Sequence, residues 1–294
     1  MTEAPRVPPP SPAEGASPGV PTLYRGAVFV VATAAGILGL RAAWWALGAE
    51  LQAAVEARIP AFFLILTGAL LVGHWWTFRS VEPRAWSAIA FSRQHLTLRG
   101  AAGGAALGAV AVGVPSLLLL LLGWLRIEPT GSGDWGRAAA MTLLVLVPAA
   151  LWEELFSRGY LFTLIRDRLG ARRAILISSV LFGLLHVQNA GATWQSVALV
   201  TLAGIFLGSI RVAFDSLYAA WSAHVAWNFV MAGLLHTAVS GVGMGTPNYR
   251  TVDAGPDWAT GGSWGPEAGF ITAVGLLLGI YLMLRRSRRG ATNA

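Results

Sequence analysis

Long apolar segments alternate with short polar ones along nearly the whole chain. Eight of them are long enough to cross the ~30 Å hydrocarbon core of a bilayer as helices that rise ~1.5 Å per residue. We place them near residues 24–47, 59–78, 98–124, 137–165, 174–189, 195–212, 216–236 and 268–285. The fifth and sixth are short for spans, so we expect them to be tilted or packed inside the bundle. The pattern predicts an all-α membrane protein, a bundle of about eight transmembrane helices.

Composition and charge support this prediction. Only 12% of the 294 residues are charged, against about 25% in a typical soluble protein. The chain has no cysteine, which excludes a disulfide framework, a thiol nucleophile and thiolate metal ligands. The net charge of +7 does not indicate nucleic-acid binding, because all 21 basic residues are Arg and most of them lie in short loops beside apolar segments. The expected surroundings are therefore a lipid bilayer.

The distribution of arginines predicts the orientation in the membrane. Most of them lie in the loops 79–99 and 166–173, at position 211, and after the last apolar segment at 285–289. These are alternate loops, so all can lie on the cytoplasmic side together, which places both termini there. No targeting signal is apparent, and the composition is typical of a bacterial protein. We therefore expect an integral protein of the bacterial inner (plasma) membrane.

The chain divides into a tail and one membrane domain. Residues 1–22 are rich in Pro and Ser and are expected to form a disordered cytoplasmic tail. Residues 23–290 form the membrane-embedded helical domain. Within it, the Gly-rich segment 236–267 is expected to be an extracytoplasmic loop, and we favour an interfacial linker over a lid. Glycines at four-residue spacing, such as Gly104 and Gly108, predict close packing of helix backbones.

Few polar residues occur inside the apolar segments. They are Glu153, Glu154 and Arg158 in the fourth segment, His186 in the fifth, and His224 and Asn228 in the seventh. One charged side chain at mid-membrane costs about 2.5–3.5 kcal/mol on insertion scales, so three within six residues indicate a function. His74, near the cytoplasmic end of the second segment, is instead expected to have a structural or interfacial role.

Depth and helical spacing bring these residues together. Measured from the expected cytoplasmic end of each helix, Glu153, His186 and Asn228 lie ~18 Å deep and His224 ~12 Å. His224 and Asn228 are four residues apart and share a helix face. The same spacing lets Glu154 form an ion pair with an arginine, Arg158. Glu153 lies about 100° away from Glu154 around the helix, so it is free to face His186.

This group of side chains suits two kinds of hydrolysis. A Glu–His pair can deprotonate a water molecule, and a His and an Asn on one helix face can donate to an oxyanion. Alternatively, Glu153, His186 and His224 could hold a zinc ion with an open position for water. The sequence does not contain the HExxH motif of metalloproteases.

Three motifs carry a resemblance to a known family. EExxxR occurs at residues 153–158, FxxxH at 182–186 and HxxxN at 224–228, in this order and on separate apolar segments. Together they resemble the CAAX protease and bacteriocin-processing family (CPBP, or Abi) of intramembrane proteases, which includes the type II CAAX prenyl endopeptidases. The resemblance covers a core of about residues 95–240.

The resemblance implies an intramembrane endopeptidase and a role for each polar residue. Glu153 with His186 would activate the water, and His224 with Asn228 would stabilise the oxyanion. Glu154 and Arg158 would hold the site or the substrate backbone. We favour a mechanism without a cofactor, with zinc as the alternative. The implied substrate is a membrane-anchored protein or peptide, or a C-terminal tail, and we favour a bacterial one over a prenylated one.

Two other classes of protein compete with the protease. In one, the polar residues only join helices, as in an immunity-type or scaffold membrane protein without catalysis. Interhelical hydrogen bonds contribute only ~0.6 kcal/mol on average, which poorly offsets the cost of two buried carboxylates. In the other, the Glu and His residues relay protons in a proton-coupled transporter. The protease alone accounts for all three motifs, and we favour it.

Overall fold

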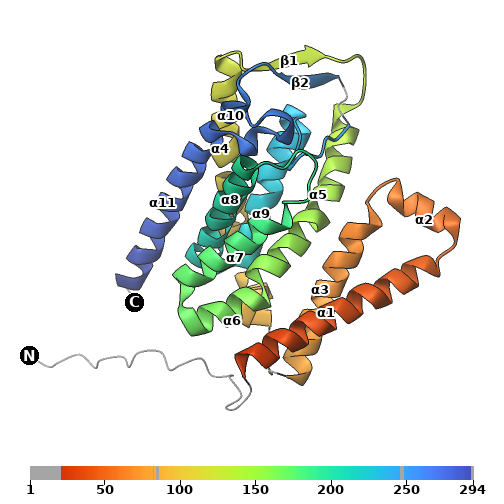
Figure 1. The fold of residues 1–294 in the computed structure, drawn as a ribbon, viewed down its shortest axis with the longest axis vertical. Coiled ribbons are helices and arrows are strands. Elements are labelled where there is room, and N and C mark those ends of the chain that lie inside the picture. Colours follow the sequence, from red (N-terminus) through yellow and green to blue (C-terminus); the bar gives the residue numbers. More distant parts are fainter. Residues whose placement is uncertain (1–20, 82, 84–85, 246–247, 293–294) are drawn as a thin grey trace, which may run out of the picture.

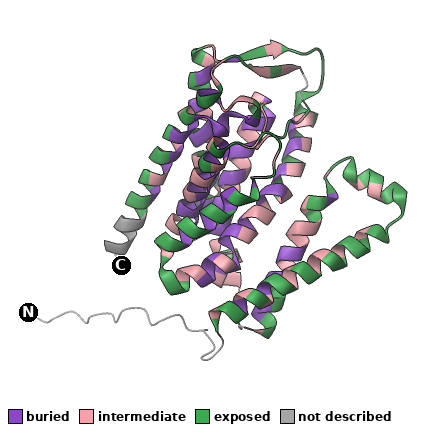
Figure 2. Cartoon of the chain, in the orientation of Figure 1, coloured by how far each residue is buried: buried purple, intermediate pink, exposed green. Residues whose placement is uncertain are grey.

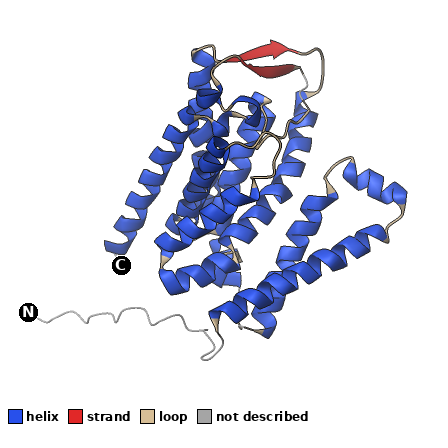
Figure 3. Cartoon of the chain, in the orientation of Figure 1, coloured by secondary structure: helices blue, strands red, loops and turns tan. Residues whose placement is uncertain are grey.

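A bundle of helices makes up most of the molecule, and a small two-stranded sheet lies at one end (Figures 1 and 3). The computed structural model describes residues 21–81, 83, 86–245 and 248–292. The predicted Pro-rich tail, residues 1–22, falls almost entirely outside these residues. Within them the chain is mostly helical, as the sequence predicts.

The elements follow one another along the chain as up-and-down helices. The helices are α1 (Thr22–Trp45), α2 (Ala49–Glu56), α3 (Ala61–Ser80), α4 (Leu98–Leu121), α5 (Trp135–Arg158), α6 (Tyr160–Leu169), α7 (Ala171–Leu185), α8 (Trp194–Ala213), α9 (Leu217–Phe229), α10 (Asp257–Thr260) and α11 (Phe270–Thr292). Strand β1 (Leu125–Pro129) pairs antiparallel with β2 (Tyr249–Asp253). A π-helical turn (Val230–Leu235) continues α9, and 3₁₀ turns occupy Trp86–Ile89, Arg93–His95, Gly262–Trp264 and Pro266–Ala268.

Five helical segments in the described part of the chain are long and apolar enough to cross a membrane. They are α1, α3, α4, the α5–α6 pair and α8. The length and apolar composition of these helices are those of an integral membrane protein. The predicted number of eight spans is not confirmed. The sixth predicted segment is not short, because α8 has 20 residues. The seventh has nearly its predicted bounds, but it is α-helical only to Phe229 and continues as a π-helical turn to Leu235.

The fourth predicted segment is not one straight helix, because the chain turns at Gly159. This residue has a non-helical backbone (φ −83°, ψ −129°), and the next amide, of Tyr160, donates to the His74 ring at 3.0 Å. A β-carbon at Gly159 would lie 2.5 Å from His74 Nε2. The other His74 nitrogen bonds to the Leu70 carbonyl, so His74 has the structural role that we expected.

The turn corrects the depth estimate for the polar residues. Glu153 lies only five residues, about 8 Å, from the end of α5 rather than ~18 Å from a cytoplasmic helix end. His186 lies directly after the last residue of α7, not in mid-helix. The polar residues still meet, because Glu153 Oε2 lies within 4 Å of the Nε2 atoms of both His186 and His224 (3.9 and 3.8 Å).

The core of the bundle lies where α4, α8, α9 and α11 meet, and Figure 2 shows the buried residues gathered there. Helices α4 and α9 are in direct backbone contact. A β-carbon at Gly104 would lie 2.1 Å from the Ala219 carbonyl oxygen, and one at Gly108 would lie 2.0 Å from that of Ala223. The predicted role of these glycines in close helix packing is confirmed, and it fixes the helix that carries His224.

We expect Gly108→Ala to lower the free energy of unfolding by about 1–3 kcal/mol, because the added methyl group forces α4 away from α9. Gly113→Ala on the same helix is the matched control. Its β-carbon would meet only Val230 Cγ1 at 3.8 Å, and alanine is the better helix former. Thermal unfolding in detergent measures the midpoint of each variant. Equal midpoints for the two variants would contradict this account of the packing.

Candidate active site

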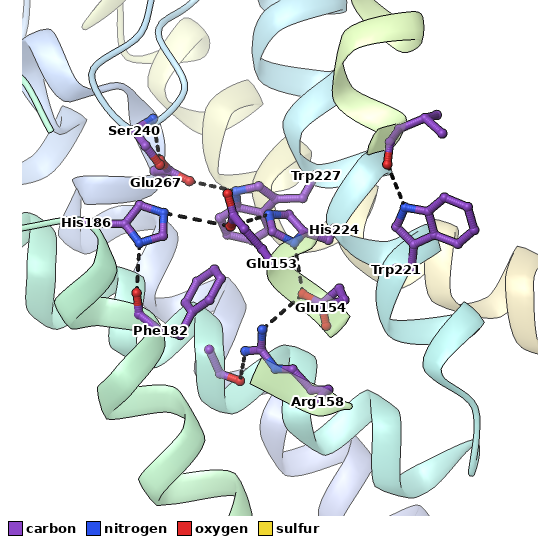
Figure 4. A network of polar contacts seen from close by, with 12 residues as sticks. Glu153, Glu154, Arg158, Phe182, His186, Trp221, His224, Trp227, Ser240 and Glu267 are labelled. Atoms are coloured by element: carbon purple, nitrogen blue, oxygen red, sulfur yellow. Dashed lines mark hydrogen bonds and ion pairs between the residues drawn. The ribbon is translucent and has the colours of Figure 1, made fainter. Parts of the chain in front are cut away.

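Four of the six predicted site residues line one cavity inside the bundle. Glu153 reaches it from α5, His186 from the end of α7, and His224 and Asn228 from α9. The cavity has a volume of about 360 Å³ and mainly apolar walls. The close-up in Figure 4 shows Glu153 between the two histidines. Polar groups that are far apart in the sequence are thus collected in one apolar chamber.

Glu153 faces both histidines. Its Oε2 atom lies 3.9 Å from His186 Nε2 and 3.8 Å from His224 Nε2. This oxygen is buried and has no hydrogen-bond partner among the residues that the structure describes. The prediction that Glu153 points at His186 is confirmed, and the proximity to His224 adds a second imidazole. The arrangement leaves a carboxylate oxygen and two ring nitrogens directed at the same small space.

The orientation of His186 depends on the end of α7. Its Nδ1 atom bonds to the Phe182 carbonyl oxygen at 2.8 Å. Since α7 ends at Leu185, this carbonyl belongs to the last turn, whose acceptors lack helical partners. The Phe182 ring packs against His186, with 4.9 Å between ring centroids. When Nδ1–H donates to this carbonyl, Nε2 is the nitrogen that faces Glu153.

His224 is oriented by a carboxylate. Its Nδ1 atom lies 2.9 Å from Glu154 Oε1, so its Nε2 faces Glu153. The same Glu154 oxygen accepts a hydrogen bond from Arg158 Nη1 at 3.0 Å, which is the predicted ion pair. Sequence reasoning missed that Glu154 also binds His224. Spacing within one helix indicates a pair, but it gives no information about a third partner 70 residues away.

Arg158 joins three helices. Besides its bond to Glu154, its Nη2 atom donates to the Gly204 carbonyl of α8 at 2.8 Å. Its guanidinium group lies 4.6 Å from the centre of the Phe182 ring on α7, a cation–π contact. Glu154 and Arg158 are fully buried and do not line the cavity. Of their two predicted roles, holding the site is therefore the one that their positions allow, because neither can reach a substrate backbone in the cavity.

Asn228 lies one helical turn after His224, on the same face of α9. It is buried and lines the cavity. In the described structure no hydrogen bond joins its side chain to another residue, so the amide is available to a molecule in the cavity.

A further carboxylate reaches the cavity from the segment that we expected to be a linker. Glu267 is 5% exposed and lines the cavity together with Ser240. The segment 236–267 contains β2, α10 and two 3₁₀ turns, and it covers one end of the chamber. The favoured linker interpretation does not describe this arrangement. The lid alternative is closer to it, but sequence reasoning did not single out Glu267, because an acidic residue among glycines is typical of a solvated loop.

The alternative zinc site would use Glu153, His186 and His224. The residue types suit zinc. In the part of the chain that the structure describes, however, no three His, Cys, Asp or Glu side chains form a group that could hold a metal ion. The zinc site with Glu153, His186 and His224 therefore stays a prediction, and we derive no step through a metal.

The fold and the cavity define an integral membrane protein with a buried carboxylate–histidine site. Residues 135–230 match the family model of the type II CAAX prenyl endopeptidase Rce1-like proteins. The matched segment is about a third of the chain and contains all three motifs. The resemblance to the CAAX protease family is thereby confirmed over these residues. No curated protein and no solved structure matches the chain.

The shared contacts of Glu154 lead to a prediction on stability. We expect Arg158→Met to lower the free energy of unfolding by about 3–5 kcal/mol, because a buried carboxylate loses its cation. Adding Glu154→Gln should recover part of the loss. The double variant should therefore lose less free energy of unfolding than the two single variants lose together. Thermal unfolding in detergent of the four proteins measures the coupling.

The control for this cycle is the exposed pair Arg250–Glu128, whose atoms lie 3.0 Å apart. Arg250→Met should cost less than about 1 kcal/mol, because solvent screens the pair. Strictly additive effects of the Glu154 and Arg158 substitutions would contradict the inferred network.

Proposed function

We propose that the protein is an intramembrane endopeptidase that hydrolyses a peptide bond of a membrane-associated or C-terminal-tail substrate. Glu153 and His186 activate a water molecule, and His224 and Asn228 stabilise the oxyanion. One observation carries the proposal. The buried Glu153 Oε2 has no hydrogen-bond partner among the described residues and faces the Nε2 atoms of both His186 and His224 in a cavity within the bundle.

In the first step, water binds between Glu153 and His186. Glu153 takes one proton from it as the general base, and His186 Nε2 accepts a hydrogen bond from the other. The water oxygen forms a bond to the carbon of the scissile carbonyl group, and the carbonyl oxygen becomes an oxyanion. The bond from His186 Nδ1 to the Phe182 carbonyl supports this step, because it turns the lone pair of Nε2 towards the cavity.

The oxyanion then needs donors, which His224 and Asn228 supply. Asn228 donates through its side-chain amide, and His224 donates through Nε2–H while Nδ1–H is bonded to Glu154. A doubly protonated His224 also balances charge, since Glu153 and Glu154 together match Arg158 and His224. Donors held in a mainly apolar cavity stabilise developing charge strongly, at about 10²–10³-fold in rate for one donor.

In the last step the carbon–nitrogen bond breaks. Glu153 returns its proton to the departing nitrogen, which leaves as an amine, and the carbonyl carbon keeps the new oxygen as a carboxyl group. Glu153 therefore acts first as a base and then as an acid, while Glu154 and Arg158 keep His224 in place. No covalent intermediate with the protein is needed, in keeping with a cysteine-free chain.

The extent of the cavity supports a membrane-bound substrate. It reaches Phe62 and Phe63 at the start of α3 and Trp152 on α5, so it extends towards the side of the bundle where α1–α3 lie (Figure 1). We propose a bacterial peptide or membrane protein as the substrate, processed at the inner membrane by a chain with cytoplasmic termini and an outer 236–267 segment. A prenylated protein is the alternative substrate, because the matched family is described as prenyl endopeptidases.

We expect Glu153→Gln to lower cleavage by about 10²–10⁴-fold, the usual contribution of a general base. The fold should remain intact, because no protein hydrogen bond to Oε2 is lost. Mass spectrometry of the C-termini of membrane and secreted proteins, from cells with either form of the protein, identifies the products. Glu128→Gln, an exposed carboxylate on β1, is the matched control and should leave cleavage unchanged.

Cleavage by Glu153→Gln at the wild-type rate would rule out the proposed mechanism. If Glu153→Gln and His186→Ala instead altered a proton-linked uptake into vesicles, the protein would be a proton-coupled transporter rather than a protease.

Metal content separates the proposed mechanism from its zinc-dependent variant. We expect elemental analysis of the purified protein to find zinc well below one atom per chain. Strong chelators should leave the cleavage rate unchanged, because Glu153 and His186 need no metal to polarise water. One zinc per chain that disappears in His186→Ala and in His224→Ala would establish the metal-dependent variant instead.

A further inference from the structure

Glu267 places a second carboxylate on the wall of the cavity that contains Glu153. It comes from the segment after α9, outside residues 135–230 that match the protease family. Oε1 accepts hydrogen bonds from the backbone N–H and the hydroxyl group of Ser240, at 2.6 and 2.7 Å. Oε2 accepts one from Trp227 Nε1 at 3.0 Å. Figure 4 shows Glu267 beside the Glu153–histidine group.

The contacts of Glu267 leave its charge without a protein counter-ion. Among the described residues no Arg or His forms an ion pair with it, and no Arg lines the cavity. A carboxylate has about four acceptor positions, and three are occupied by neutral donors. One position on Oε2 remains. A charge in an apolar chamber is costly unless a partner of opposite sign compensates it.

Fixing the segment over the cavity does not by itself require a carboxylate. A neutral amide oxygen could accept the bonds from Ser240, and Trp227 is already held by its packing in the core. An amide would weaken these hydrogen bonds but keep those to one oxygen, whereas a cationic ligand would lose its counter-ion. Trp227, Asn228 and Glu267 all line the cavity, so the carboxylate lies in the same chamber as the predicted oxyanion site.

We propose that Glu267 is a specificity-determining residue that binds the cationic group of a substrate Lys or Arg close to the scissile bond. This inference rests on the proposed endopeptidase function and specifies its substrate class. The cationic side chain donates to the open position of Oε2 and neutralises the charge of the chamber. The same charge repels an acidic substrate side chain or a free C-terminal carboxylate at this end of the cavity.

The test uses palmitoylated decapeptides of Ala and Leu in phosphatidylcholine vesicles, which are zwitterionic and do not attract cations themselves. The peptides form three series, one each for Lys, Gln and Glu. Within a series, the single Lys, Gln or Glu is placed at a different position in each peptide. Wild-type protein should cleave the Lys peptide about tenfold faster than the Gln peptide at one position near the cleaved bond, and the Glu peptide more slowly still. Glu267→Gln should abolish these differences.

Two control variants separate charge from structure. Trp227→Phe removes a hydrogen bond to Glu267 but keeps the charge, so the order of the three peptides should persist even if all rates fall. Glu128→Gln removes an exposed carboxylate and should change neither rates nor order. Binding of dansylated peptides to Glu153→Gln protein, which should cleave about 10²–10⁴-fold more slowly, is measured in parallel and should follow the same order.

The outcomes distinguish the inference from the function on which it rests. Cleavage with equal rates for Lys, Gln and Glu peptides overturns the inference alone, as does a Glu267→Gln protein that loses rate equally on all three. If no peptide is cleaved but Glu153→Gln still binds Lys peptides most tightly, cation binding by Glu267 stands and the proposed protease function fails.

Discussion

The arrangement of the site depends on one buried oxygen atom, Oε1 of Glu154. It accepts hydrogen bonds from Arg158 in its own helix and from His224 of α9. Arg158 in turn binds the Gly204 carbonyl of α8. A carboxylate inside an apolar bundle is tolerable only with such compensation, and here the compensation ties three helices together. The cost of the buried charge is therefore also the reason why His224 has one orientation.

Close backbone contacts turn this local network into a rigid frame. Gly104 and Gly108 bring α4 against α9, and Gly159 lets the chain turn where His74 receives the next amide. Each contact excludes even a methyl group, so the helices that carry the polar side chains cannot shift independently. Glu153 differs from Glu154 because no hydrogen bond joins its side chain to another described residue. Its Oε2 has no hydrogen-bond partner among the described residues, which leaves this oxygen free for chemistry while the rest of the network is held.

Sequence reasoning predicted the contacts that repeat with helical period and missed those that do not. The Glu154–Arg158 pair follows from four-residue spacing, and the position of Glu153 opposite His186 follows from its angle around the helix. The break at Gly159, in contrast, depends on a side chain 85 positions earlier, and Glu267 reaches the cavity through a segment without periodicity. Side-chain bonds to a distant backbone leave no pattern in composition, so only the folded chain reveals them.

The cavity combines residues of two different origins within the chain. Glu153, His186, His224 and Asn228 all lie inside the matched segment 135–230, and they supply every group that the proposed hydrolysis needs. Glu267 and Ser240 lie outside that segment, and they form the covering wall. This wall can change in charge or shape without disturbing the Glu154–Arg158–His224 network, because the side-chain hydrogen bonds that Ser240 and Glu267 receive from the matched segment come from Asn189 and Trp227, which lie outside that network. In the proposed mechanism this separation would allow one reaction to act on different substrates, since the wall would contact the residues beside the bond while Glu153 and the histidines act on the bond itself.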